Sequence, residues 1–210
     1  MSWKNDQVTD KETAEILRLA KEALLVEGDF VEMGCYKGDT SLLLAEVLRD
    51  GSASGGRGGS GGVPVEKDVQ KSVKKLWIYD SFEGLPEKSK FDESVLGVDF
   101  KGGELFVTKR EVKERFLRAG LPVPVIRKGW FSELTEKDVP EKIAFSFLDG
   151  DFYESIRDSL RLVAPRMVTN GVLVVHDYSN PALPGVKKAV DEFMSDFEMD
   201  MGAEFRVILL

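Results

Sequence analysis

The stretch Phe30–Thr40, with the sequence FVEMGCYKGDT, is the most informative feature of this chain. Its first four residues predict a short buried strand, Gly34 and Gly38 predict a sharp turn, and a helix is expected from Thr40. A glycine turn between a strand and a helix lets backbone N–H groups approach a ligand at the helix end that carries partial positive charge. The stretch therefore predicts a cofactor pocket at the carboxyl edge of a parallel sheet.

Strands and helices alternate along the rest of the chain. We expect strands at 29–33, 75–80, 123–127, 143–149, 172–177 and 205–210, and helices at 9–26, 40–48, 109–119, near 134, 155–164 and 186–197. This order predicts an α/β fold with a doubly wound, mostly parallel sheet and helices on both of its faces. Only one strand is expected after the last helix, so we expect the C-terminal edge of the sheet to be shortened or closed by a partner subunit.

Composition and charge narrow the class of protein. A chain of 210 residues is expected to form one domain over residues 1–210. A net charge of -8 and an isoelectric point near 4.9 argue against nucleic-acid and anionic membrane partners, which require a basic surface. The sequence shows no membrane-spanning run and no signal peptide, and its single cysteine, Cys35, suits a reducing compartment. We therefore expect a cytoplasmic protein in which Cys35 is a buried filler; a reactive thiol is the alternative.

Two long segments separate the expected helices and strands. Residues 51–62, GSASGGRGGSGG, predict a flexible Gly/Ser-rich linker between a helix and the following strand, at the amino ends of the strands and away from the ligand. The long loop 81–108 follows a strand and therefore lies on the ligand side, where such loops often act as lids. We expect this loop to form much of a pocket for a small polar or aromatic molecule on the ligand side.

Residues at the ends of the first three strands suit an adenosine-containing cofactor. Glu32 ends the first strand, and the hydroxyls of Thr40 and Ser41 at the helix start offer donors to a ligand carboxylate. Asp80 ends the second strand, where an acidic side chain accepts both hydroxyls of a ribose. Asp80 follows Gly34 by 46 residues. Without the Gly/Ser-rich segment and its polar continuation to about Val73, the interval is roughly 20 residues, which is typical of such folds. Trp130 follows the third strand, where an aromatic face would flank an adenine; core packing is the alternative.

The fourth and fifth strands end in acidic residues and the only histidine of the chain. Asp149, His176 and Asp177 are expected to converge on one divalent cation, because carboxylates at apolar strand ends are costly unless paired, hydrated or metal-bound. Asp151 is the candidate general base. If no metal binds, His176 becomes the base, since an imidazole titrates near neutral pH.

Together these motifs resemble the macrocin O-methyltransferase family of class I S-adenosylmethionine-dependent enzymes, which act on sugars and phenols. The resemblance spans about Asp29 to Phe197 and rests on FVEMGCYKGDTS, IYDSFEGLPE, KGWFSELT, FLDGDFYES, VVHDY and PGVKKAVDEF. It implies a Rossmann-like class I methyltransferase fold and S-adenosylmethionine as the cofactor. By this resemblance the methionine part lies among Glu32, Gly34, Tyr36, Gly38 and Thr40 or Ser41, the ribose by Asp80 and Ser81, and the adenine by Trp130 and Phe131.

The resemblance also implies that Asp149 contacts both the cofactor side and a metal. His176-Asp177 departs from the two acidic residues expected in metal-dependent members, and an imidazole suits Mn²⁺ or a softer ion better than Mg²⁺. The implied reaction is methyl transfer to a hydroxyl of a sugar, phenol or similar metabolite, with Tyr36 or Phe82 facing the sulfonium. The oligomeric state is open, with a homodimer among the candidates.

Two other functions are compatible with the same pattern. A nicotinamide-dependent oxidoreductase shares the architecture, but Gly34-x-x-x-Gly38 departs from G-x-G-x-x-G, and no Tyr-x-x-x-Lys pair is evident. A non-catalytic methyltransferase-like binding module is the third interpretation, kept open by His176.

Overall fold

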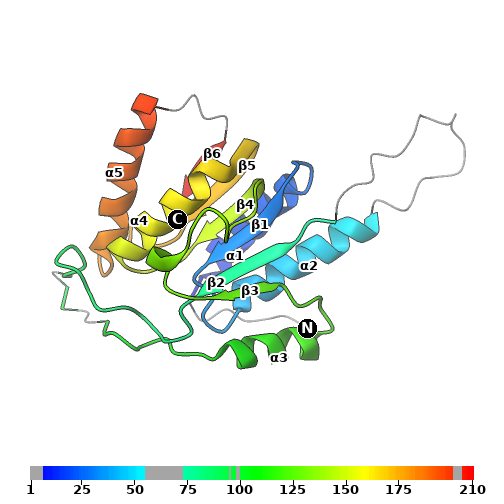
Figure 1. Cartoon of the computed structure of the whole chain (residues 1–210), viewed down its shortest axis with the longest axis horizontal. Coiled ribbons are helices and arrows are strands. Elements are labelled where there is room, and N and C mark those ends of the chain that lie inside the picture. The colour runs from blue at the N-terminus through cyan, green and yellow to red at the C-terminus, as the bar shows by residue number, and fades with distance from the viewer. Residues whose placement is uncertain (1–6, 55–72, 95, 98–99, 201–204) are drawn as a thin grey trace, which may run out of the picture.

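A computed structural model describes residues 7–54, 73–94, 96–97, 100–200 and 205–210 (Figure 1). Its helices are α1 (Asp10–Ala23), α2 (Asp39–Ser54), α3 (Lys109–Ala119), α4 (Tyr153–Val163) and α5 (Pro184–Asp200). Its strands are β1 (Asp29–Met33), β2 (Leu76–Asp80), β3 (Val125–Lys128), β4 (Ile143–Leu148), β5 (Met167–Val175) and β6 (Arg206–Leu209). Two short 3₁₀ turns, Phe131–Glu133 and Ala164–Arg166, complete the elements.

Within these residues the strands form one sheet in the order β3-β2-β1-β4-β5-β6, and every neighbouring pair is parallel. The doubly wound parallel sheet predicted from the sequence is therefore confirmed. The chain leaves β1 toward β2 and later returns to β4 on the other side of β1, so the direction of winding reverses between β1 and β4. In such sheets ligands bind outside the carboxyl ends of the strands at this reversal, which is where the predicted turn lies.

Helices cover both faces of the sheet, as Figure 1 shows for α4 and α5 on one side and α2 on the other. On the α1–α3 side, Leu44 of α2 and Phe116 of α3 are fully buried in one apolar cluster. On the other side, Ile156 of α4 and Val186 of α5 are buried in a second cluster. The central strands β1 and β4 are buried on both faces, as expected for a parallel sheet, whereas the edge strands β3 and β6 are partly exposed.

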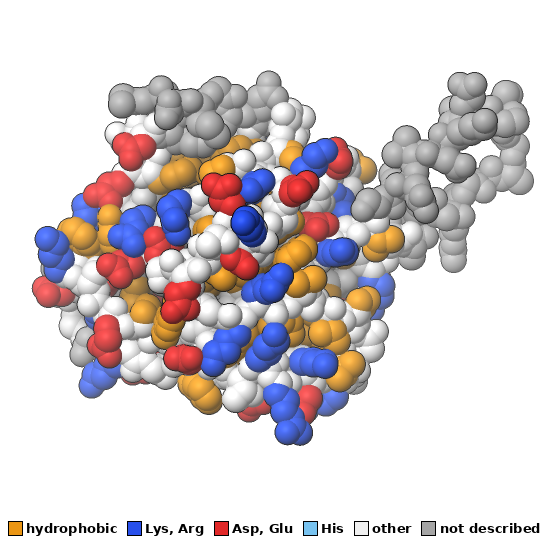
Figure 2. All heavy atoms as spheres, in the orientation of Figure 1, with side chains coloured by type: hydrophobic (Ala, Val, Ile, Leu, Met, Phe, Trp, Pro, Cys, Tyr) orange, Lys and Arg blue, Asp and Glu red, His pale blue; other side chains and the backbone are white. Residues whose placement is uncertain are grey.

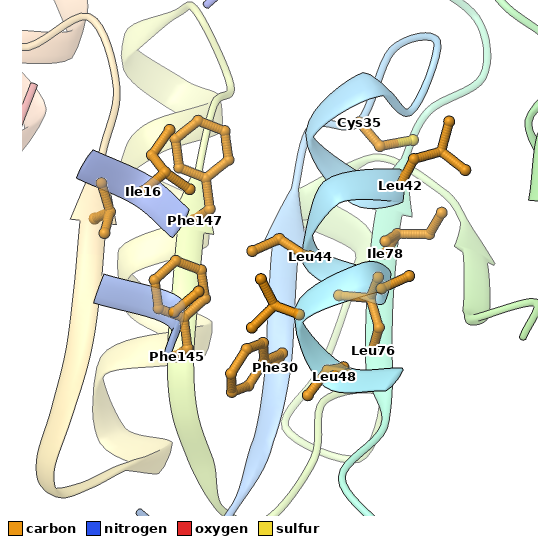
Figure 3. Close-up of a cluster of buried hydrophobic side chains, with 14 of the residues drawn as sticks. Ile16, Phe30, Cys35, Leu42, Leu44, Leu48, Leu76, Ile78, Phe145 and Phe147 are labelled. Carbon is orange, nitrogen blue, oxygen red and sulfur yellow. The ribbon is translucent and has the colours of Figure 1, made fainter. Parts of the chain in front are cut away.

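Figure 3 shows the first cluster, in which Ile16 of α1 and Leu44 of α2 lie with Phe30, Phe145 and Phe147 of the strands. Cys35 lies beside Leu42 at the carboxyl end of this cluster and is buried. Burial raises the pKa of its thiol well above the ordinary value. A buried thiol with a raised pKa stays neutral, which favours the filler over the reactive thiol.

The predicted Gly/Ser-rich linker begins later than expected. α2 continues through Ser54, so residues 51–54 are helical, and the remainder of the predicted linker, 55–62, lies outside the described residues. Gly51 explains the difference, because a Cβ at that position would lie 2.7 Å from Leu24 Cδ1 beside α1. A glycine that reads as a helix breaker in the sequence here allows two helices to pack closely.

Other boundaries shift by a few residues. α1 begins at Asp10, because Thr9 is its N-cap in a capping box with Glu12. β5 begins at Met167 rather than at 172, and the helix expected near Leu134 is the 3₁₀ turn Phe131–Glu133.

The surface in Figure 2 carries Lys and Arg interspersed with Asp and Glu, with basic side chains more frequent toward its lower edge, where Figure 1 places α3. Among the described residues, no helix has the length and apolar character needed to cross a bilayer.

Candidate active site

The ladder of backbone hydrogen bonds continues past the strand ends and aligns the predicted site residues. Gly34 N–H donates to Tyr79 O at 2.9 Å, Asp149 N–H to Met33 O at 2.8 Å, and His176 N–H to Leu148 O at 3.0 Å. Residues that immediately follow β1, β4 and β5 are thereby held at one edge of the sheet.

The turn after β1 has an unusual backbone. Gly34, Tyr36 and Gly38 have φ angles of 90°, 43° and 81°, and the left-handed region is costly for a residue with a Cβ such as Tyr36. Asp80 compensates, because its Oδ2 accepts hydrogen bonds from the N–H groups of Cys35 and Tyr36, each at 3.0 Å. Its Oδ1 accepts from Phe82 N–H at 2.8 Å. Asp80 thus holds the turn in place, a role that the sequence did not predict.

Gly34, just after β1, lies against the backbone just after β4. A Cβ at this position would lie 2.0 Å from the carbonyl oxygen of Asp149, so only glycine fits. The two strand ends that carry the predicted methionine and acidic sites therefore touch through their backbones.

Glu32 and Ser41 lie beneath the turn. Both are buried, and the Ser41 hydroxyl donates a short hydrogen bond to Glu32 Oε2. Burial, reinforced by the nearby carboxylates of Asp149 and Asp80, raises the pKa of Glu32 well above its ordinary value. Glu32 lines the cavity described below, whereas Ser41 and Gly38 are not among the lining residues.

Asp149, His176 and Asp177 form a compact cluster. His176 is buried, and its Nδ1 lies 3.0 Å from Asp149 Oδ1 and 3.0 Å from Asp177 Oδ2. Burial alone lowers the pKa of His176, but the hydrogen bonds to the two carboxylates outweigh it and raise this pKa to about 11. The same contacts hold the pKa of Asp177 below its ordinary value, against the effect of burial.

Asp151 lies beside this cluster with a left-handed backbone, φ 62°. Burial raises its pKa well above the ordinary value, and the carboxylates of Asp149 and Asp177 add to the shift.

One cavity brings most of the predicted residues together. Its lining includes the predicted residues Glu32, Gly34, Tyr36, Thr40, Asp80, Ser81, Trp130, Phe131, Asp149, Asp151, His176 and Asp177. Phe82 is instead buried in the first apolar cluster, so its predicted contact with a sulfonium is wrong. Tyr36 lines the cavity. The ammonium of Lys37 lies over its ring, 4.8 Å from the ring centroid, in the kind of contact that was predicted for a sulfonium.

Two further segments line the cavity, one that the sequence predicted and one that it did not. Gly84, Leu85, Pro86 and Leu105 of loop 81–108 line it, as expected. Backbone hydrogen bonds from Leu85 N–H to Glu104 O and from Gly103 N–H to Leu85 O hold the two arms of this loop together. Gln7 and Val8, before α1, form an unpredicted wall.

Glu12 of α1 was likewise missed, although its Oε2 lies 3.8 Å from His176 Nε2. The pattern Thr9-x-x-Glu12 marks a helix start in the sequence, but the direction of α1 across the sheet follows only from packing.

Comparisons with known proteins bear on the family and the fold of the chain. The model of the macrocin-O-methyltransferase (TylF) family matches residues 13–203. A Streptomyces olivaceus protein, 8-demethyl-8-(2,3-dimethoxy-alpha-L-rhamnosyl)-tetracenomycin-C 4'-O-methyltransferase, is 30% identical over 80% of this chain and 58% of its own length. Demethyldecarbamoylnovobiocin O-methyltransferase of Streptomyces niveus is 28% identical over 83% of this chain and 61% of its own length.

Among solved structures, the O-methyltransferase NovP superposes with a TM-score of 0.71 at 25% identity, covering 93% of this chain and 76% of NovP. The fold is thus the Rossmann-like fold of class I O-methyltransferases. The chain spans about three fifths of the length of the curated relatives that it matches.

Proposed function

The chain belongs to the macrocin O-methyltransferase family, and we propose that it transfers a methyl group from S-adenosylmethionine to a hydroxyl oxygen of a small molecule. One observation carries the proposal. The glycine turn, the aromatic residues after β3 and the acidic cluster after β4 and β5 all line a single cavity at the reversal of the sheet. A nucleotide-like cofactor and a polar acceptor site would therefore share one space.

The reaction is an in-line displacement, to which the protein contributes mainly position and electrostatics. The turn 34–40 would bind the methionine part, and Trp130 with Phe131 the adenine. Asp149 lines the cavity together with the turn, His176 and Asp177, and it would contact the cofactor on the side of the acceptor.

Asp151 is the better candidate for the general base. A base works best when its pKa lies near the working pH, and burial shifts Asp151 in that direction. His176, held between two carboxylates with a pKa of about 11, carries a proton at neutral pH. An imidazolium has no lone pair for a hydroxyl proton, which counts against His176 as the base in the metal-free protein.

A sugar hydroxyl is the acceptor that the comparisons favour. The Streptomyces olivaceus relative acts, by its name, on the 4' oxygen of a rhamnosyl tetracenomycin. Loop 81–108 contributes Leu85, Pro86 and Leu105 to the cavity that the acidic cluster also lines. An apolar wall next to hydrogen-bonding groups suits a sugar ring, which has apolar faces and a hydroxylated edge.

Asp149, His176 and Asp177 fit a divalent cation by their donor set. One ligand atom of each lies within 4.8 Å of the others, and two carboxylates with one imidazole suit Mn²⁺ better than Mg²⁺. A cation held there would lower the pKa of the acceptor hydroxyl.

We expect treatment with EDTA to lower the rate of methyl transfer by roughly tenfold or more, and added Mn²⁺ to restore it better than Mg²⁺. The measurement is transfer of a radiolabelled methyl group to a panel of rhamnosides, other glycosides and phenols. A rate that EDTA leaves unchanged would rule out metal assistance and leave the rest of the proposal standing.

A thermal-shift experiment tests the cofactor. Saturating S-adenosylhomocysteine is expected to raise the melting temperature by several degrees, since about 2.7 kcal/mol is gained at one hundred times the Kd. NAD at the same concentration should leave it unchanged. Stabilisation by NAD and not by adenosylhomocysteine would instead support the oxidoreductase alternative.

A further inference from the structure

Helix α3 packs against the outer side of the glycine turn. A Cβ at Gly38 would lie 3.3 Å from Val112 Cγ1, so the turn and this helix are already in close contact. Arg115 lies one helical turn after Val112, on the same face of α3. It reaches the turn from outside, because it is not among the residues that line the cavity.

The Arg115 guanidinium spans Gly38. Its Nη1 donates to the carbonyl oxygen of Lys37 at 2.7 Å, and its Nη2 donates to Asp39 Oδ1 at 2.5 Å. The side chains of Arg115 and Asp39 are only 24% and 9% exposed. Because this ion pair is largely shielded from water, solvent screens it less than a surface pair.

The negative charge of Asp39 affects how any ligand binds at the turn. Asp39 is the first residue of α2 and lines the cavity together with Thr40, at the end of the helix that carries partial positive charge. An uncompensated carboxylate there would repel the carboxylate of a bound amino acid. Asp80 and Asp149 line the same cavity and add to the negative charge.

We propose that Arg115 is a positioning residue of the cofactor site. By bridging Lys37 and Asp39 it fixes the outer half of the turn and offsets the charge of Asp39, so that the turn binds the carboxylate end of S-adenosylmethionine. Asp80 holds the inner half, at Cys35 and Tyr36. This inference rests on the proposed function, since it names a residue that tunes the same site.

Calorimetric titration with two ligands tests the proposal. S-adenosylhomocysteine contains the amino-acid end, whereas 5'-methylthioadenosine has the adenosine and the sulfur without it. In Arg115→Met we expect the Kd of adenosylhomocysteine to rise about tenfold or more, because two charge-assisted hydrogen bonds are lost. The Kd of methylthioadenosine should change by less than about twofold.

Arg110→Met is the matched control. Arg110 is on the same helix, but its side chain is 87% exposed and pairs with Glu114 in solvent, so both affinities should stay at the wild-type values. If Arg115→Met does not fold by circular dichroism, Arg115→Lys takes its place. Lysine retains the charge but not the fork of donors, and it should again weaken adenosylhomocysteine selectively.

Equal weakening of both ligands, or unchanged affinity for adenosylhomocysteine, would overturn the role of Arg115 while leaving the proposed function intact. A wild-type protein that binds neither ligand would overturn the proposed function and this inference with it.

Discussion

Asp149→Asn is expected to lower the rate of methyl transfer by at least about 10²-fold while leaving the protein folded. The Asp149 carboxylate lines the cavity, accepts a hydrogen bond from His176 Nδ1 at 3.0 Å, and contributes to the raised pKa of Asp151. Asparagine has nearly the same shape but carries no charge, so the cation site and the surroundings of the base both change. The rate is measured with radiolabelled S-adenosylmethionine and the glycoside and phenol panel.

Glu27→Gln is the control for this variant. Glu27 undergoes the same change from acid to amide, but it lies just before β1 at the amino end of the sheet, where its side chain is 77% exposed and pairs with Lys142. Its rate should equal that of the wild type. Transfer by Asp149→Asn at the wild-type rate would refute the assignment of the acidic cluster.

Gly34→Ala is expected to be the most destabilising single substitution in the site. The added Cβ would lie 2.0 Å from the Asp149 carbonyl oxygen, and the backbone φ of 90° is itself unfavourable for alanine. The left-handed backbone costs roughly 1–2 kcal/mol, and forcing β1 and β4 apart adds on the order of 1–3 kcal/mol. Urea unfolding followed by circular dichroism measures the loss.

Gly103→Ala separates these two costs. Gly103 has a similar φ, 83°, but nothing lies within 4 Å of a Cβ built there. It should therefore lose only the backbone part, about 1–2 kcal/mol. If the two variants are equally stable, the contact between Gly34 and Asp149 is not the reason for the glycine.

The sequence predicted those parts of the fold that local chemistry determines. β1 and α3 have the predicted bounds. For α3, residues at its two ends explain why the prediction was correct. Thr108 and Glu111 form a capping box, and Gly120 ends the helix in a left-handed conformation. The predicted end of α2 was wrong. Gly51 lies within the helix and packs against Leu24, a tertiary contact that the local sequence pattern does not contain.

In the site, too, some features follow from the local sequence and others only from tertiary packing. Parallel strands bring their carboxyl ends to one edge, so the positions of Asp80, Asp149 and His176 followed from strand assignment alone. The partners of these residues did not. Asp80 meets the N–H groups of the turn because Tyr36 adopts a left-handed conformation, and Arg115 reaches the turn because α3 packs on Gly38. Both depend on three-dimensional geometry that spacing along the chain does not contain.

A crystal structure of the wild-type protein with S-adenosylhomocysteine tests the central claim most directly. We predict that the amino-acid end lies against residues 34–40, the adenine beside Trp130 and Phe131, and the sulfur on the side of Asp149, with Asp80 still bound to the N–H groups of Cys35 and Tyr36. Adenosylhomocysteine bound elsewhere, or absent from this cavity at saturating concentration, would contradict the account.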